Sequence, residues 1–202
     1  MLEAGVARDD LAHLYPDWIN RGLRAAQRDH SWNFMRHVAS VTMAAGTSSV
    51  ALPDNFKQLQ PQQGSVALYD AVDGYFPCEV LTRERILLAR SSPQNGRFNV
   101  RVFLSNDGNQ EFLNYLDNTT TAATFSIAYF RFLPPLVADS DENYLTREFE
   151  EMIQAKIKQI AFSTINDPQA GVELGLYEVE KRKAVAFDAR QYVQGRNVRM
   201  GG

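Results

Sequence analysis

The three histidines of this 202-residue sequence are its first candidates for chemistry, because an imidazole can bind a metal ion or transfer a proton near neutral pH. They are His13, His30 and His37. A zinc site on a helix needs two histidines four residues apart with an acid between them, and no pair here has that spacing. We therefore interpret the histidines as surface or helix-flanking residues, and we predict no metal site.

A nucleophilic thiol is the second possibility, and the sequence has one cysteine, Cys78, in the run Phe-Pro-Cys-Glu-Val. This run carries none of the signatures that surround catalytic cysteines, and its composition favours a half-buried strand. No glycine-rich phosphate loop and no nucleophile elbow occurs either. The sequence thus predicts no catalytic residue and no cofactor site, and we expect no enzyme.

Carboxylates gather in two short stretches that could bind a cation. These are Asp70 with Asp73, and Asp139 with Asp141 and Glu142. Both stretches have the composition of turns or linkers, and both lack the glycine at the sixth position and the later glutamate of a calcium-binding loop. We interpret them as solvated acids.

A basic run could instead contact nucleic acid. Arg83, Arg85 and Arg90, with Glu84 among them, fall on a predicted short helix over 83–90, which indicates either a DNA contact or a solvated helix face. The formal net charge of −3 argues against a protein whose main task is to bind phosphates, so we favour the solvated face.

The element that must organise the chain is a long amphipathic helix near its start. Apolar or small residues recur from residue 11 at the spacing of one helix face, and Pro16 suits a first turn, so we predict a short turn followed by a helix over 17–30. Trp18 falls on the apolar stripe. We therefore expect Trp18, Trp32 and Phe34 to pack in a core rather than to stack on bases.

The middle of the chain has the period of strands. A hairpin is predicted from the strands 38–43 and 50–52, which the turn at Gly46 separates. Further strands are predicted where apolar residues alternate between tight-turn dipeptides, at 65–69, 76–80, 98–104, 111–115 and 124–132.

The helical period returns after residue 142. Thr146 is a candidate cap for a helix whose apolar stripe contains Phe149, Met152, Ile153, Ile157, Ile160 and Ala161. Asp167-Pro168 then begins another helix, on which we expect Val172, Leu176, Val179 and Ala186 to face inward. Residues 191–202 contain Arg196 and Arg199 and no acid, and we expect an unfolded tail there.

Together these elements predict an α+β fold, in which N- and C-terminal helices form an antiparallel bundle with an inserted β-rich region. The expected parts are 1–44 (N-terminal helical part), 45–138 (β-rich insertion), 139–190 (C-terminal helical part) and 191–202 (flexible tail).

Composition places limits on compartment and class. Apolar residues make up 45% of the chain and charged residues 22%, which is ordinary for a soluble globular protein. No apolar run is long enough to span a membrane, and residues 1–10 carry charges instead of a signal-peptide pattern. A single cysteine excludes a disulfide within the chain. We expect a protein made in a reducing cytosol, with no membrane partner.

Three runs together resemble the opening of the head-to-tail adaptor proteins of tailed bacteriophages. They are Leu-Tyr-Pro-Asp-Trp-Ile-Asn at 14–20, Arg-Asp-His-Ser-Trp-Asn-Phe at 28–34 and Val-Ala-Leu-Pro-Asp-Asn-Phe at 50–56. Residues 128–136 resemble the closing strand of that family, and the sequence from 145 through 178 is similar to its C-terminal helical pair. The region 60–120 departs most from the family pattern.

The resemblance implies a structural virion protein at the head-tail interface, present in the host cytoplasm during assembly. It implies a ring of about twelve copies that binds the portal protein, extends the DNA channel and receives a tail or nozzle protein. Genomic DNA would pass through the lumen without specific binding, which suits a negatively charged subunit. In that family the C-terminal segment often reaches into the portal, so the implied portal-binding residues are Tyr192, Arg196, Val198, Arg199 and Met200.

Two alternatives remain open. One is a peptidoglycan hydrolase carried in the virion, for which no acid pair can be assigned. The other is a DNA-binding module that uses the arginines of 83–90 and 196–199, and its affinity would fall steeply with salt.

Overall fold

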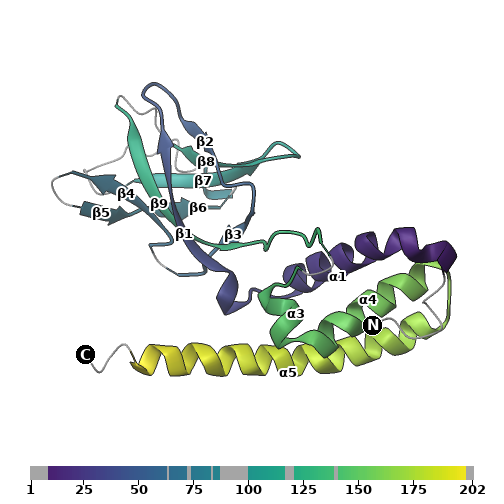
Figure 1. Ribbon diagram of the computed structural model, residues 1–202. Helices are drawn as coiled ribbons and strands as arrows, with labels where there is room; N and C mark the ends of the chain where they lie inside the picture. The colour runs from purple at the N-terminus through teal and green to yellow at the C-terminus, as the bar shows by residue number, and fades with distance from the viewer. Residues whose placement is uncertain are drawn as a thin grey trace. The chain divides into compact units, whose positions relative to one another are not determined.

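The computed structural model describes residues 9–62, 64–71, 74–82, 84–86, 100–116, 121–138 and 141–198, with side chains described from residue 11 to residue 191 of these ranges (Figure 1). The chain forms two compact units. The helical unit contains Met1–Met35 and Phe132–Gly202, and the β unit contains Arg36–Arg131.

The helical unit begins with a 3-10 helix, η1 (Asp9–Leu14), which leads into α1 (Tyr15–Asp29). Pro16 lies in the first turn of α1, where its missing N–H would have no helical acceptor. The predicted division into a short turn and a firm helix is therefore confirmed. A second 3-10 helix, η2 (Asn33–Met35), ends this part of the unit.

Three further helices complete the helical unit: α3 (Tyr144–Glu148), α4 (Glu150–Thr164) and α5 (Gln169–Val198). Asn143 caps α3: its side-chain oxygen accepts from the Thr146 backbone N–H, and the Thr146 hydroxyl accepts from the Asn143 backbone N–H. The two residues thus form a capping box. Asp167 caps the start of α5, where its Oδ1 accepts from the Gln169 N–H at 2.8 Å.

α1 packs closely against α4 because a glycine faces it. A Cβ atom at Gly22 would lie only 2.7 Å from Ile157 Cγ1, so any larger residue here would require the Ile157 side chain or one of the two helices to move. Trp18 is 1% exposed and packs with Ala161 and Phe162, while Trp32 is fully buried. Core packing of the tryptophans, as the sequence predicts, is confirmed.

The predicted antiparallel bundle of N- and C-terminal helices is wrong. α4 runs antiparallel to α1 and to α5 and lies between them, so α1 and α5 run in the same direction on the two sides of α4 (Figure 1). The helices thus form a layer with α4 in its middle. The cause is the tight turn between α4 and α5, which returns α5 along α4 and not along α1.

The β unit contains nine strands in the described residues: β1 (Arg36–Met43), β2 (Ser49–Ala51), β3 (Phe56–Leu59), β4 (Val66–Asp70), β5 (Gly74–Pro77), β6 (Glu79–Leu81), β7 (Arg101–Asn106), β8 (Glu111–Tyr115) and β9 (Ala123–Arg131). One sheet has the order β1-β9-β4-β5, with β3 also paired to β9, and the other has the order β2-β8-β7-β6. Both sheets contribute side chains to one apolar core, which includes Val66, Val102, Leu113, Phe125 and Ile127.

Some predicted strands are paired differently from the expectation. β1 pairs with β9 and β2 pairs with β8, so the two strands of the predicted hairpin lie in different sheets. The predicted strand 76–80 is divided at Cys78 between β5 and β6, again in different sheets, and β3 was not predicted. By contrast, β8 has the predicted bounds.

Unit boundaries also differ from the sequence-based ones. The chain leaves the helical unit after Met35 and returns at Phe132, whereas the sequence placed these changes at 44/45 and 138/139. α5 extends to Val198, into the stretch that the sequence predicts as a flexible tail from residue 191.

Candidate functional site: the surfaces of the helical unit

Two polar contacts fix the orientation of α5. The Tyr177 hydroxyl donates to Asp29 Oδ2 at 2.8 Å, and Tyr177 is completely buried. Burial and the hydrogen bond to Asp29 both raise the pKa of Tyr177, with burial the larger cause, so the phenol stays protonated.

One helical turn before the end of the described side chains, Asp188 makes the second contact. It is 5% exposed, and its Oδ2 accepts from the Asn33 backbone N–H at 3.0 Å and from Asn33 Nδ2 at 2.9 Å. His30 Nε2 lies 3.8 Å from the same oxygen. A buried carboxylate with several donors is well satisfied, and its removal would leave those donors without an acceptor.

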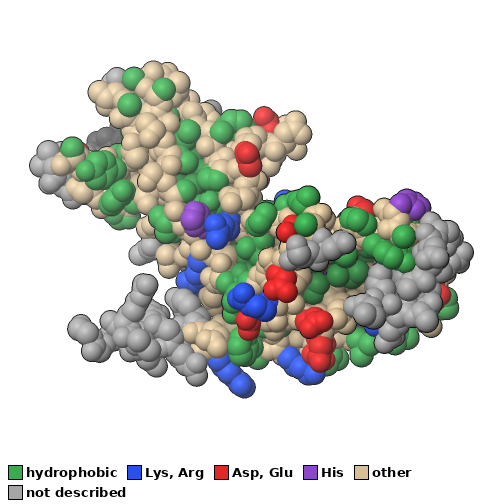
Figure 2. Space-filling view, in the orientation of Figure 1, with side chains coloured by type: hydrophobic (Ala, Val, Ile, Leu, Met, Phe, Trp, Pro, Cys, Tyr) green, Lys and Arg blue, Asp and Glu red, His purple; other side chains and the backbone are tan. Residues whose placement is uncertain are grey.

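These contacts turn the apolar stripe of α5 outward. Val172, Leu176 and Val179 are 65%, 49% and 50% exposed, and Ala186 is also exposed. The prediction that they face inward is therefore wrong. The buried side of α5 is formed by Tyr177, Ala184 and Asp188 instead. Figure 2 shows hydrophobic side chains (green) at the surface along part of α5.

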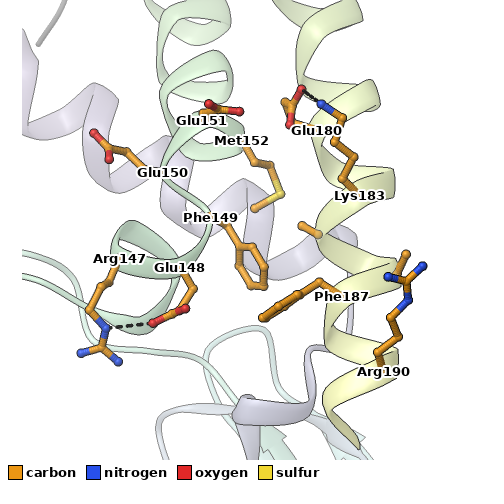
Figure 3. Close-up of a pocket in the computed structure, with 12 residues that line it drawn as sticks. Arg147, Glu148, Phe149, Glu150, Glu151, Met152, Glu180, Lys183, Phe187 and Arg190 are labelled. Atoms are coloured by element: carbon orange, nitrogen blue, oxygen red, sulfur yellow. Dashed lines mark hydrogen bonds and ion pairs between the residues drawn. The ribbon is translucent and has the colours of Figure 1, made fainter. Parts of the chain in front are cut away.

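A groove of about 690 Å³ lies between the α3–α4 junction and α5 (Figure 3). Phe149 and Phe187 point toward each other in it, with ring centroids 5.9 Å apart in an edge-to-face arrangement. Phe149 is buried, whereas Phe187 is 41% exposed, so the groove has an apolar floor that solvent reaches from the α5 side.

The rim of this groove is charged but does not form a catalytic pair. Glu148 accepts from Arg147 Nε at 3.1 Å and Glu180 from Lys183 Nζ at 2.7 Å, so each carboxylate has a basic neighbour along its own helix. Glu150 points away from the groove centre (Figure 3). Glu151 also lies near Lys183, because the hydrogen bond to Glu180 and the charge of Glu151 both raise the pKa of that lysine. These two carboxylates thus flank one ammonium group, and we assign no acid pair to glycoside hydrolysis.

A second groove, of about 340 Å³, lies along α1 beside the segment Leu133–Pro135. Gln27 Oε1 accepts from the Leu133 N–H at 2.6 Å, and Asn20 exchanges two hydrogen bonds of 2.9 Å with the backbone of Leu136. These contacts hold an irregular segment against the helix. The groove is mostly apolar and is preformed.

Three arginines stand along α1 beside this second groove. Arg21, Arg24 and Arg28 recur at the spacing of one helix face and are exposed. The Arg24 guanidinium lies 3.4 Å from the centroid of the Phe132 ring. The sequence analysis missed this row, although its i, i+3, i+7 spacing is visible in the sequence.

The histidines that the sequence singled out do not gather into a metal site. His13 is exposed on η1, and His30 lies edge-on to the Trp32 ring at 4.6 Å between centroids. In the β unit, His37 lies edge-on to the Tyr129 ring at 5.6 Å. In the part of the chain that the structure describes, no group of three metal-ligating side chains comes together.

Cys78 is buried between the strands β5 and β6 and is 7% exposed. Burial raises the pKa of its thiol to about 11, so the sulfur is a neutral thiol near neutral pH and a poor nucleophile. The sequence predicts a half-buried strand residue here, but Cys78 is buried and lies between two strands and not within one.

The acidic and basic clusters have local structural roles where they are described. Asp141 accepts from the Val137 and Ala138 N–H groups at 2.8 and 2.9 Å, and these hydrogen bonds lower its pKa. Arg85 pairs with Glu79 at 3.2 Å. Four residues of these clusters lie outside the described residues: Asp73, Arg83, Arg90 and Asp139.

The predicted portal-binding residues cannot be described at the level of side chains. Tyr192, Arg196 and Val198 lie on the last turns of α5, of which the structure describes the backbone only, and Arg199 and Met200 lie outside the described residues. Among the described helices, none has both the length and the hydrophobicity that a membrane span requires.

The exposed surfaces of the helical unit are thus its candidate functional sites. A comparison with protein families agrees with this interpretation: the model of the SU10 adaptor protein family matches residues 2–199. None of the curated proteins matches the chain. Since the family model covers nearly the whole sequence, the chain belongs to the SU10 adaptor protein family and is a structural adaptor protein of a bacteriophage.

Proposed function

We propose that this adaptor is a subunit of a ring of about twelve copies that docks on the portal protein, extends the DNA channel and receives a tail or nozzle protein. The observation that carries the proposal is the family match over residues 2–199, since an adaptor must bind other proteins of the head or tail. Its role is then mechanical and needs no reactive group.

The length of α5 supports portal docking through the C-terminal segment. α5 has 30 residues, about 45 Å of helix, and is twice as long as α4, which has 15. From Arg190 onward the sequence contains Arg196 and Arg199 and no acid. We propose that Tyr192, Arg196, Val198, Arg199 and Met200 bind the portal, with the arginines meeting acidic groups and the larger apolar side chains entering pockets.

The net charge supports a channel role. A ring of subunits that each carry a formal charge of −3 repels a DNA backbone, so DNA passes without forming lasting contacts. The complex should form in the host cytoplasm and persist at the head-tail interface of the virion.

The experiment is to mix the purified adaptor with portal rings and to measure the mass of the product by native mass spectrometry. The full chain should add about one ring of copies to the portal. A chain that ends at Arg190 should bind the portal at least roughly tenfold more weakly, while a matched control that lacks only Gly201 and Gly202 should bind like the full chain. Equal binding by the chain that ends at Arg190 would refute docking through this segment.

The purified adaptor can also be tested for the other two functions that the sequence leaves open. A peptidoglycan hydrolase would clear cell-wall substrate on a zymogram, and a DNA-binding module would retard duplex DNA with an affinity that falls steeply as salt rises. We expect neither result.

A further inference from the structure

A long strand of the β unit, β1, lies at the edge of its sheet. β1 has eight residues and, among the described strands, pairs with β9 alone, in a register without a bulge. On its other side β9 pairs with β3 and β4, so the sheet continues away from β1. One long side of β1 therefore has no partner strand in the part of the chain that the structure describes.

The hydrogen bonds of Ala128 on β9 show which backbone groups of β1 face this open edge. The Ala128 C=O accepts from the Gln60 N–H at 3.0 Å, and its N–H donates to the Ser65 C=O at 2.7 Å, so both groups point away from β1. Val38 lies opposite Ala128 in the register. Opposed residues of an antiparallel pair either share two hydrogen bonds or both point away from each other. The N–H and C=O of Val38 therefore point to the open edge.

Ser40 and Thr42 repeat the orientation of Val38, because the direction of the backbone groups alternates along a strand. Three pairs of N–H and C=O groups thus face the open edge at intervals of about 6.8 Å, over a length of roughly 14 Å. The backbone of an extended polypeptide presents acceptors and donors at the same repeat, so the edge is complementary to an added strand.

The side chains beside this edge leave room for such a strand. Val38 is 61% exposed, and Ser40 and Thr42 are also exposed. Their neighbours across the sheet on β9 are Ala128, Ser126 and Thr124. All of these side chains are small or β-branched and carry no charge. An added strand would therefore lie beside a flat, uncharged surface, which suits small or β-branched side chains.

The length and composition of β1 differ from those of a protected edge. Natural proteins protect exposed strand edges by keeping them short or by placing lysine, proline or a bulge on them. The other described strands with an open side, β2, β3, β5 and β6, have only three or four residues, and β5 ends at Pro77. β1 has at least twice that length and contains neither lysine nor proline. Its open edge thus has the features of a binding surface for another polypeptide.

A second copy of the chain is a poor match for this edge. Its short open strands have three or four residues, which is too few to pair along the eight of β1. Pairing of β1 with β1 of a second copy is an isologous contact, and such a contact stops at a dimer. A strand from a different protein has neither restriction.

We propose that an extended segment of another virion protein, about five residues or longer, pairs with β1 through the backbone groups of Val38, Ser40 and Thr42. The segment adds a strand to the sheet, and its side chains on the outer face are small or β-branched and uncharged. Since the chain is a structural adaptor protein of a bacteriophage, its partners are other proteins of the head or tail. The inference requires neither the ring nor portal docking through the end of α5.

A photoreactive residue identifies the chain that lies beside β1. Phage particles are assembled with Val38→p-benzoylphenylalanine, which places the reactive group at an exposed position next to the open edge, and are then irradiated. We expect a cross-link between the adaptor and a different protein. A cross-link between two adaptor copies, or no cross-link, would overturn the inference.

Two substitutions at position 40 test whether this contact uses the backbone. Ser40→Pro removes an N–H at the open edge and leaves the pairing with β9 intact, because this N–H faces away from β9. The cross-link yield should fall at least roughly tenfold in this variant. The matched control Ser40→Thr keeps the N–H and should leave the yield unchanged. Equal yields from the two variants would contradict pairing through the backbone.

Hydrogen exchange tests the same contact without a substitution. In the free adaptor, the amides of Val38, Ser40 and Thr42 should exchange faster than those of Ala39 and Val41, whose N–H groups face β9. In phage particles the first three amides should exchange at least roughly tenfold more slowly than in the free adaptor. Unchanged exchange in the particles would overturn the inference. Slow exchange of these amides in the concentrated free adaptor would show that a second copy covers β1, which also rejects it.

The native mass measurement on portal rings decides the proposed function independently. A missing ring together with the expected cross-link at β1 would reject the proposed function alone. A normal ring on the portal, in particles that give no cross-link at β1, would reject this inference alone.

Discussion

The close approach of α1 and α4 yields the sharpest prediction about stability. An alanine at position 22 would place its Cβ 2.7 Å from Ile157 Cγ1 and 3.4 Å from Ile157 Cα. Carbon atoms in contact prefer about 3.5–4.0 Å, so either the Ile157 side chain or one of the helices must move. Gly22→Ala should therefore destabilise the helical unit.

Two opposing effects determine the size of this change. Overpacking of a close-packed site costs about 1–3 kcal/mol. Replacing glycine by alanine within a helix gains about 1 kcal/mol, because alanine loses less backbone entropy on folding. We expect a net loss of about 0–2 kcal/mol for Gly22→Ala, and a larger loss for Gly22→Val, whose branched side chain also lowers helix propensity.

α5 supplies the matched control. A Cβ at Gly175 would meet no atom within 4 Å, so Gly175→Ala should stabilise the protein by about 0.5–1 kcal/mol through helix propensity alone. The free energy of unfolding should be measured by urea titration with tryptophan fluorescence, because both tryptophans report on the helical unit. If Gly22→Ala proves as stabilising as Gly175→Ala, the close contact with Ile157 does not exist.

Three further predictions concern the buried polar groups. Asp188→Ala removes the acceptor for the Asn33 donors and should lower the free energy of unfolding by about 1.5–3 kcal/mol. Asp188→Asn keeps one acceptor oxygen and should lower it less. Equal urea midpoints for both variants and the unmodified chain would contradict the stabilising role of Asp188. Folding raises the pKa of Tyr177, so its contribution to stability is present below the unfolded pKa of about 10 and is lost progressively as the pH rises above it. The difference in unfolding free energy between the unmodified chain and Tyr177→Phe should therefore shrink between about pH 9 and 11. Since burial raises the pKa of Cys78 to about 11, an aromatic disulfide reagent at pH 8 should label it slowly in the native protein and rapidly in denaturant, and rapid native labelling would count against the buried position.

Local pattern predicted several elements well. Met152, Ile153 and Ala161 are buried on α4, as their spacing indicates, because a helix repeats its faces regardless of what it packs against, and Phe149 is buried directly before its first residue. The turn dipeptide before residue 111 and the alternation after it likewise predict β8 with its observed bounds.

The orientation of α5 could not be predicted in this way. Its stripe of Val172, Leu176 and Val179 is the more apolar face, and periodicity alone would bury it. The helix is turned by Tyr177 and Asp188, whose partners Asp29 and Asn33 lie 148 and 155 residues away in sequence. Hydrogen bonds over such separations leave no periodic signal.

The predicted strand pairing was wrong for a similar reason. β1 pairs with β9 in a register that joins Arg36 to Phe130, although β2 is the next strand in sequence. Only the core shared by both sheets selects that pairing, and the alternation within β1 is compatible with either partner. The portal-binding residues, by comparison, came from a family resemblance, and they remain a prediction.

A cryo-electron microscopy map of the adaptor assembled on portal rings would test the proposed function most directly. It should show a closed ring of about twelve copies in which the last turns of α5, from Tyr192 onward, lie against the portal. A map without a closed ring, or a ring in which this end of α5 does not contact the portal, would refute the proposal.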